Sequence, residues 1–137
     1  MAFEITKIQP ERLYQRVVNG VTLYSHLVCV TPGRTIYISG QLARNARGEI
    51  VAPNDMAGQI RAVGENLKIA LEAAGASLND LVKTTTFVTD IDEFFKHVEV
   101  RALYLGSALP ASTTVEVRRL SHPDLMIEIE AVAVVRE

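Results

Sequence analysis

The side chains in this sequence best suited to chemistry are two carboxylates on a segment rich in alternating residue types. From Leu125 to Ala131, the two-residue period of a β-strand puts only apolar residues on one face, and Met126 with two glutamates on the other. Glu128 and Glu130 therefore share the polar face, about 7 Å apart along the strand. Glu116, on the preceding segment, would add a third carboxylate to that face. Two interpretations stay open: a solvated surface, or a general acid/base in a groove, where burial or a like charge raises one carboxyl pKa.

One cation occupies an unusual place in the pattern. Arg101 follows Val98 at helical spacing and precedes Leu105, so it lies at the margin of an apolar stripe and not opposite it. Most such arginines lay the aliphatic stem on the apolar surface and keep the guanidinium in water. A smaller number point the cation into a pocket, where it can bind an anionic group. The spacing is compatible with both arrangements.

Metal and nucleotide sites are not indicated. The histidines, His26, His97 and His122, lie far apart, without HxxxH, CxxC or clustered carboxylate spacing. Glycine-rich phosphate-binding loops and a GxSxG nucleophile motif are also missing from the sequence. The single cysteine, Cys29, lies in an apolar run without a nearby base, which predicts a buried filler and not a nucleophile. We therefore expect no metal site.

Composition limits the class of protein. A chain of 137 residues, 48% hydrophobic and 22% charged, fits one globular domain over 1–137 that needs no disulfide or metal. The net charge is −2 and no segment concentrates Lys or Arg, so a nucleic-acid partner is not expected. No apolar stretch approaches the ~20 residues that span a bilayer, and the first residues do not form a signal peptide. We therefore expect no membrane partner and a cytoplasmic location, which also suits a lone cysteine.

Strands and helices alternate in an order that would position these side chains. Runs of β-branched and aromatic residues between turn signals predict the strands. They cover residues 22–30, 35–39, 81–89, 112–120 and 125–135. The loop at 45–54 holds one further short strand, and the four-residue connection 121–124 predicts a hairpin of the last two strands. Gly40, at the end of the second strand, indicates a turn or a close backbone approach.

Two helices are predicted between these strands. Apolar residues at helical spacing indicate one over 56–74, capped by Asn54 or Asp55 and followed by Gly75 in the left-handed conformation. The same spacing indicates another over 91–105. An open sheet with both helices on one face accommodates this order, which is an α+β architecture.

Together these segments resemble the RidA/YjgF family, also described as L-PSP endoribonuclease-like or Rid proteins. The resemblance covers nearly the whole chain and rests on seven motifs in the family's order with compatible spacing. The motifs are Tyr24-Ser25-His26, Ile38-Ser39-Gly40-Gln41, Asn66-Leu67 with 73–78, 82–90, Pro110-Ala111 and 127–133. The resemblance implies a chorismate-mutase-like mixed β-sheet with two helices packed on one face, assembled as a homotrimer with three clefts between subunits.

The resemblance also implies an activity. Catalytic members hydrolyse 2-aminoacrylate-type enamines and imines to 2-keto acids and ammonia, without a metal or an organic cofactor. Matched by position, the catalytic carboxylate is Glu128, which positions water for addition to the imine carbon. The substrate-binding residues implied in the same way are Tyr24, Ser39, Gly40, Ser112, Thr113 and Thr114.

One departure from the family pattern bears on the substrate. Deaminating members have Pro-Ala-Arg, whose arginine grips the substrate carboxylate through two hydrogen bonds, whereas this chain has Pro110-Ala111-Ser112. Losing that contact weakens binding by about 2–3 kcal/mol, or roughly 30- to 150-fold.

We therefore predict a cofactor-free hydrolase or deaminase for an imine- or enamine-like metabolite other than simple 2-imino acids. Arg101 is the candidate replacement for the missing cation. The alternative is a non-catalytic ligand-binding trimer, a metabolite sensor or holdase-like protein, on the same scaffold. A ribonuclease is disfavoured by the acidic, unpatterned charge.

Overall fold

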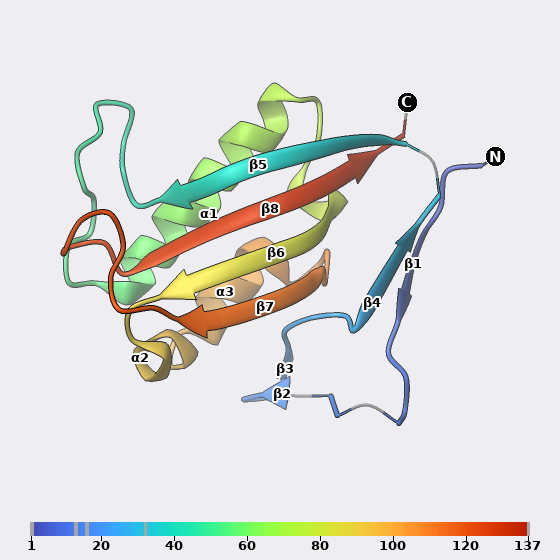
Figure 1. The fold of residues 1–137 in the computed structure, drawn as a ribbon, viewed down its shortest axis with the longest axis horizontal. Coiled ribbons are helices and arrows are strands. Elements are labelled where there is room, and N and C mark those ends of the chain that lie inside the picture. Colours follow the sequence, from blue (N-terminus) through green and yellow to red (C-terminus); the bar gives the residue numbers. More distant parts are fainter. Residues whose placement is uncertain (1, 13, 16, 32, 137) are drawn as a thin grey trace.

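A four-stranded mixed sheet with helices on one face forms the centre of the molecule (Figure 1). The computed structural model describes residues 2–12, 14–15, 17–31 and 33–136 of the chain. The strands are, in order across the sheet, β5 (Arg34–Leu42), β8 (Ile127–Val135), β6 (Leu81–Val88) and β7 (Ala111–Glu116). Strand β8 is antiparallel to both β5 and β6, whereas β6 and β7 are parallel. This is the α+β arrangement that the order of elements predicts.

The helices pack on the face of the sheet that carries the apolar residues of β8. They are α1 (Met56–Ala73), α2 (Ile91–Phe95) and α3 (Val98–Leu105), with a short 3₁₀ turn, η1 (Leu78–Asp80), before β6. Ile60, Val63 and Leu67 of α1 are buried in one core with Ile127 and Ile129 of β8. The other face carries no helix of the described residues, and we call it the open face (Figure 1). Over the same residues, no helix has the length and apolar character needed to cross a membrane.

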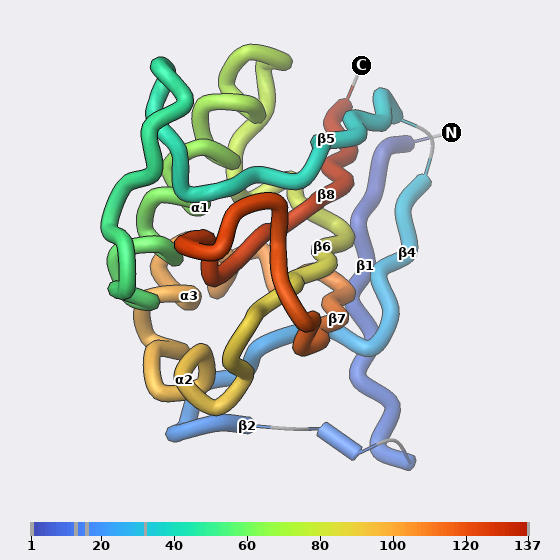
Figure 2. The backbone as a smooth tube through the Cα atoms, turned by 60° about the vertical axis from the view of Figure 1, so that its left-hand side comes forward, coloured from blue at the N-terminus to red at the C-terminus, as the bar shows by residue number. Residues whose placement is uncertain are grey.

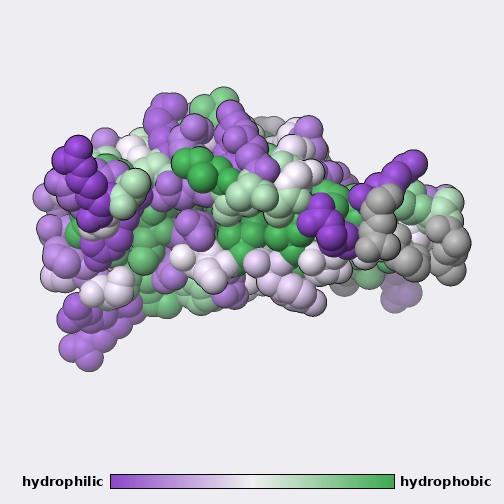
Figure 3. Space-filling model, turned by 90° about the horizontal axis from the view of Figure 1, so that it is seen from above, coloured by the Kyte–Doolittle hydropathy of each residue, from purple (hydrophilic) through white to green (hydrophobic). Residues whose placement is uncertain are grey.

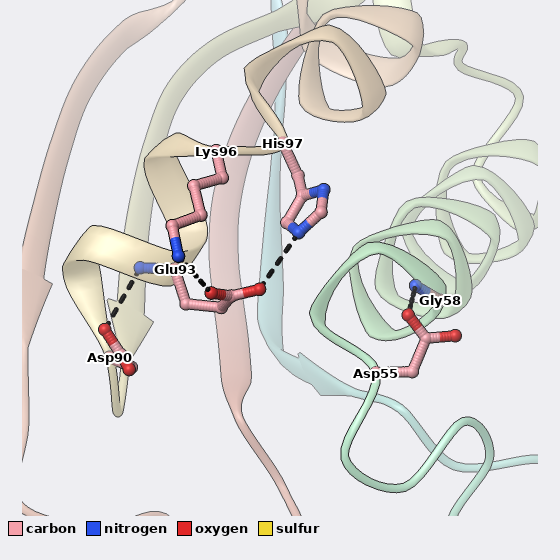
Figure 4. A network of polar contacts seen from close by, with 6 residues as sticks. All are labelled: Asp55, Gly58, Asp90, Glu93, Lys96 and His97. Carbon is pink, nitrogen blue, oxygen red and sulfur yellow. Dashed lines mark hydrogen bonds and ion pairs between the residues drawn. The ribbon is translucent and has the colours of Figure 1, made fainter.

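Aspartate side chains begin the first two helices (Figure 4). Asp55 accepts a hydrogen bond from the backbone N–H of Gly58 (3.0 Å), which makes Asp55, and not Asn54, the cap of α1. Asp90 accepts in the same way from the backbone N–H of Glu93 at the start of α2 (3.0 Å). Each bond satisfies a backbone N–H that has no partner inside its own helix.

The Asp55 cap has a measurable contribution to stability. Replacing Asp55 with Ala should lower the free energy of unfolding by about 1 kcal/mol, because the bond to Gly58 is lost. The check is a urea midpoint measured at matched protein concentration. Asp92→Ala is the matched control, because Asp92 is an exposed aspartate of α2 that does not cap it, and it should shift stability by only a few tenths of a kcal/mol. Equal losses in both variants would contradict the assignment of the cap.

The single helix predicted over 91–105 is in fact two helices. Between α2 and α3, the backbone N–H groups of Lys96 and His97 bond to carbonyls three residues earlier, at 3.2 and 3.0 Å. The Glu93 carboxylate also accepts from Lys96 Nζ (3.1 Å) and His97 Nε2 (3.2 Å), which holds this tighter turn in place (Figure 4). The hydrogen bond from Lys96, and then that from His97, lowers the pKa of Glu93. Because the pKa of Glu93 is lower in the folded state than in the unfolded state, its ionised carboxylate stabilises the fold at neutral pH. This contribution is lost as the pH falls through the lowered pKa.

The N-terminal part of the chain lies beside the central sheet and does not join it. Strand β1 (Ile5–Ile8) pairs antiparallel with β4 (Leu27–Val30), and β2 (Val17–Val18) with β3 (Val21–Thr22). Figures 1 and 2 show β1 and β4 side by side and away from the helices. The single strand predicted over 22–30 is therefore wrong. Its middle leaves the strand because Ser25 is buried there, donating from its backbone N–H to Pro110 O (3.1 Å) and from its hydroxyl to Leu109 O (2.5 Å).

Cys29 is exposed, and the prediction that it is a buried filler is wrong. It lies on β4, where the exposed side chains of Leu27 and Cys29 alternate with the half-buried ones of Val28 and Val30. A two-stranded sheet outside the main core leaves one face of an apolar run in solvent.

The hairpin predicted for the last two strands is also wrong. Strand β6 lies between β7 and β8, and β7 ends at Glu116, where the backbone N–H of Val117 bonds to Val88 O (2.8 Å). The turn signal at 121–124 is local and carries no information about which strand becomes the neighbour. In the parallel register Glu116 pairs with Val88, so it does not share the face of Glu128, and its carboxylate instead accepts from the backbone N–H of Ile91 (3.1 Å).

Candidate active site

The residues predicted to form the site lie on two opposite faces of the sheet. Strand β8 alternates as expected, with Ile127, Ile129 and Ala131 buried towards the helices and Glu128 and Glu130 on the open face. The cross-strand register extends these two faces over β6 and β7. Thr85 and Thr113 share the open face with Glu130. The neighbouring positions, Thr84, Thr86, Ser112 and Thr114, share the helix-covered face.

On the open face, the Glu128 carboxylate rests directly on the backbone of Gly40. Strand β5 is bulged between Ile38 and Gln41, and β8 runs alongside this irregularity. A Cβ atom at position 40 would overlap Glu128 Oε2 and lie 2.7 Å from its Cδ. A side chain at position 40 would displace the Glu128 carboxylate from this place, so Gly40 marks a close approach inside the strand and not the strand's end. The half-buried carboxylate thus lies against this backbone, and its oxygens can accept protons.

Ser39 and Thr113 belong to the same face. Ser39 lines a hollow of about 300 Å³ together with Lys83, Thr85 and Glu130. Lys83 Nζ donates to Thr113 Oγ1 (3.1 Å), which ties β6 to β7 across the open face. The hollow is shallow and its charges are mixed, with one cation and one carboxylate among its lining side chains.

The remaining predicted residues meet at the edge of the sheet, on the side of the helices. They line a cavity of about 160 Å³, which we call the edge cavity, and they are Tyr24, Arg101, Ser112 and Thr114. Its other walls are the apolar side chains Leu23, Phe94 and Phe95. Arg101, from α3, is only 3% exposed, so its guanidinium does not extend into solvent. Arg101 Nη2 donates to Ser112 Oγ (3.2 Å), and Thr84 Oγ1 donates to the same oxygen (3.1 Å).

The electrostatics of the edge cavity are set by one buried cation. Burial lowers the pKa of Arg101 to about 10, so the guanidinium is still protonated at neutral pH. Among the described residues, no carboxylate forms an ion pair with Arg101. Arg101 Nη1 and the nearby strand hydroxyl Thr86 Oγ1 are both buried without a hydrogen-bond partner. The cavity is therefore positively charged, and Arg101, one of the residues that line it, has an unused hydrogen-bond donor.

Tyr24 reaches the edge cavity because its neighbour, Ser25, is tied to the segment before β7. The bonds of Ser25 to Leu109 and Pro110 hold the loop after β3 against the start of β7. The Tyr24 hydroxyl donates to the Tyr14 carbonyl (3.2 Å), and its ring meets the His26 ring edge-on, with centroids 5.1 Å apart.

Several residues of the site were not predicted. Ser25, Thr84 and Thr86 are buried polar residues, although Thr84 and Thr86 occupy a β-branched run that reads as an ordinary strand. A usable signal is the run of three threonines at 84–86, because it puts hydroxyls on both faces of the strand and therefore also on the covered one. Phe94 and Phe95, which also line the cavity, were not predicted as site residues either. Over the described part of the chain, no three His, Cys, Asp or Glu side chains come close enough to hold a metal.

The geometry of the fold and the site defines a class of protein. It is a small α+β protein with a mixed sheet, a carboxylate fixed on the open face and a cationic cavity at the edge strand. Residues 15–135 match the family model described as Endoribonuclease L-PSP. The chain belongs to this family, which is the RidA/YjgF family that its motifs resemble, so that prediction is confirmed.

Individual relatives support the same assignment. A RutC family protein from Pyrococcus horikoshii is 42% identical over 104 residues, covering 76% of this chain and 82% of the relative. The 2-iminobutanoate/2-iminopropanoate deaminase of Escherichia coli is 42% identical over 111 residues, with coverage of 76% and 82%. The crystal structure of a Rid-family protein of unknown function from Yersinia pestis superposes with a TM-score of 0.82, at 35% identity, over 96% of this chain and 98% of that one. The predicted fold class is thereby confirmed.

Proposed function

We propose that this protein is a cofactor-free hydrolase that deaminates an imine- or enamine-like metabolite other than simple 2-imino acids. The observation that carries the proposal is the Glu128 carboxylate, which is half-buried on the open face and lies against the backbone of Gly40. Support comes from the Escherichia coli relative, whose name states that it deaminates 2-iminobutanoate and 2-iminopropanoate.

Glu128 would serve as the general base and then the general acid. It accepts a proton from a water whose oxygen adds to the imine carbon, so a carbinolamine forms. The carboxyl returns this proton to the nitrogen. It then takes the hydroxyl proton of the carbinolamine and passes it to the amino group, so that the C–N bond breaks as the C=O bond forms and ammonia leaves a carbonyl product. Water supplies all the atoms gained, and no oxidant or reductant is needed. An enamine enters the same sequence after tautomerising to its imine. Groups placed in this way typically contribute 10²- to 10⁴-fold to the rate.

The site would be completed between copies of the chain, in a cytoplasmic homotrimer. Glu128 and the edge cavity lie on opposite faces of one sheet, so a small ligand cannot touch both within a single copy. The open face of one copy placed against the edge cavity of the next would bring them together. Tyr37, 81% exposed on β5, favours such a contact. Figure 3, a view from above, shows apolar patches between polar ones on that side of the molecule. Strand β5 is also an uncovered sheet edge.

Ser112 would make the substrate preference differ from that of an arginine-containing member. Its oxygen already accepts hydrogen bonds from Arg101 and Thr84, so its own O–H remains to donate to a ligand. A single neutral donor can bind a carbonyl, a hydroxyl or an imine nitrogen. It cannot replace the two charge-assisted hydrogen bonds that a guanidinium makes to a carboxylate. Thr114 and Tyr24 would supply the neighbouring polar contacts, with Ser39 and Thr113 on the open-face side.

The decisive experiment compares wild type with Ser112→Arg on freshly generated imines. An amino-acid oxidase or a dehydratase produces either 2-aminoacrylate or imines with larger side chains, and release of the keto acid is followed in the presence and absence of the protein. We expect wild type to accelerate only the larger imines, and Ser112→Arg to gain on 2-aminoacrylate by roughly 30- to 150-fold in kcat/KM. Strong wild-type activity on 2-aminoacrylate would contradict the assigned role of Ser112. Inactivity of both proteins on every imine would favour the non-catalytic ligand-binding trimer.

A further inference from the structure

The guanidinium of Arg101 is a buried charge without a counter-charge in the part of the chain that the structure describes. It is 97% removed from solvent, it donates one hydrogen bond to a neutral hydroxyl, and Nη1 has no partner in the described structure. No described carboxylate lies within ion-pairing distance of it. A buried cation in this condition is costly, and in proteins it is normally compensated by an anion. The chain itself does not supply that anion among its described residues.

The edge cavity beside Arg101 has the size and lining of a site for a small organic acid. Its volume is about 160 Å³, which is roughly that of five water molecules. Among the described residues that line it, Arg101 is the one charged side chain, and Ser112 and Thr114 add hydroxyls on the sheet side. Thr86, the partner of Thr114 in the register, brings a second buried polar atom without a partner to the same side of the sheet.

The lining also indicates which anion fits. Leu23, Phe94 and Phe95 form apolar walls, which favour a ligand with a hydrocarbon body and exclude one that is charged throughout. A phosphate ester or phosphate ion carries close to two negative charges and usually meets several cations or backbone N–H groups. A monocarboxylate needs one guanidinium and one or two hydroxyl donors, and these are the groups present.

We propose that Arg101 binds the carboxylate of the substrate in the edge cavity, as a specificity-determining residue on helix α3. This inference rests on the proposed function and narrows it to imines and enamines of carboxylic acids with an apolar body. The carboxylate of the ligand would lie beyond Ser112, next to the helices. A ligand group bound by the side chain of residue 112 itself would lie less deep in the cavity. Ser112, held between Arg101 and Thr84, would contact the same ligand closer to the reacting carbon.

A competing explanation is that Arg101 only supports β7 through its bond to Ser112. In that case removing the charge changes stability and leaves the preference of the cavity for anions unchanged. The two explanations therefore differ in a ratio of affinities and not in a melting temperature.

The test measures binding of 4-methyl-2-oxopentanoate and of its neutral amide to the full-length protein by calorimetry. We expect wild type to prefer the carboxylate by about 10- to 100-fold, and Arg101→Met, which keeps the volume without the charge, to bind both within about twofold. Arg119→Met is the matched control, because Arg119 is exposed and bonds only to the carbonyl of Leu120, and it should keep the preference.

Two results would overturn the inference. One is a carboxylate preference that persists in Arg101→Met; the other is a wild type that binds acid and amide equally, which requires no variant to fold. Binding does not depend on turnover, so the outcome separates from that of the proposed function. A carboxylate preference without imine hydrolysis would support the carboxylate site at Arg101 and contradict the proposed hydrolase activity. Hydrolysis that is unaffected by Arg101→Met would support the hydrolase activity and contradict the carboxylate site.

Discussion

Replacing Glu128 with Gln is expected to lower kcat/KM for imine hydrolysis by about 10²- to 10⁴-fold while leaving the fold intact. Glutamine has nearly the same shape, so it can occupy the space over Gly40 without disturbing the β5 bulge. It cannot accept a proton from water at neutral pH, and the general-base step is lost. The measurement is steady-state release of the keto acid, coupled to a dehydrogenase, beside a urea melt that checks stability.

Glu130→Gln is the matched control for this result. Glu130 lies on the same strand and the same face two residues further on, but it is exposed and lines the open-face hollow without resting on a glycine. Its replacement should change kcat/KM by less than about threefold, within the range of a surface charge effect. Equal losses in the two variants, or an active Glu128→Gln protein, would remove Glu128 from the mechanism.

Glu128→Gln, combined with a variant of the edge cavity, also tests whether the site spans two copies. Thr114→Phe fills the edge cavity and should be inactive alone, as should Glu128→Gln. If each cleft takes Glu128 from one copy and the cavity from its neighbour, unfolding the two variants and refolding them together makes about a quarter of the clefts intact. Activity should then return to about that fraction of wild type. If both halves came from one copy, no intact site would form and the mixture would stay inactive.

The features of the site that sequence predicts well are those decided by neighbouring residues. Alternation along β8 identifies the face of Glu128 because the period of a strand is two, whatever lies next to it. The start of α1 at Asp55 and its end before Gly75, which has a φ of 74°, follow from local backbone preferences. The close approach at Gly40 is likewise indicated by its residue type, although the group that approaches it is not.

What sequence does not predict depends on residues far apart in the chain. Helical spacing places Arg101 at the margin of an apolar stripe, but its burial depends on β7 and on the loop that carries Tyr24. The pairing of β7 with β6 puts Ser112 and Thr114 on the helix-covered face, whereas a hairpin with β8 was predicted. A shift of one residue in register exchanges the two faces, so no local pattern at 112–114 reveals that the site is divided.

Gln59→Leu is expected to destabilise the protein by about 2–4 kcal/mol, the largest stability effect anticipated for a single polar side chain here. Gln59 lies on α1 with no exposed surface, and its amide joins α1 to the segment that leads into β8. Nε2 donates to Asp124 O (2.7 Å) and Ala52 O (3.2 Å), while Oε1 accepts from the backbone N–H of Met126 (2.8 Å). Leucine fills a similar volume but leaves these backbone groups without partners. The free-energy penalty of the unpaired groups is larger than the gain from burying the apolar leucine side chain.

This loss should also reach the site, because Met126 lies two residues before Glu128 on the same run of chain. Loosening the start of β8 should therefore lower kcat/KM at temperatures well below the melt, in addition to lowering the urea midpoint. Gln41→Leu is the control, since Gln41 is less buried and its amide bonds only to the nearby Ser39 carbonyl (3.0 Å). We expect it to change stability by less than about 0.5 kcal/mol. Both variants must be compared at one protomer concentration, because the stability of an oligomer depends on it. A Gln59→Leu protein as stable as wild type would show that water or a rearranged loop satisfies the three backbone groups.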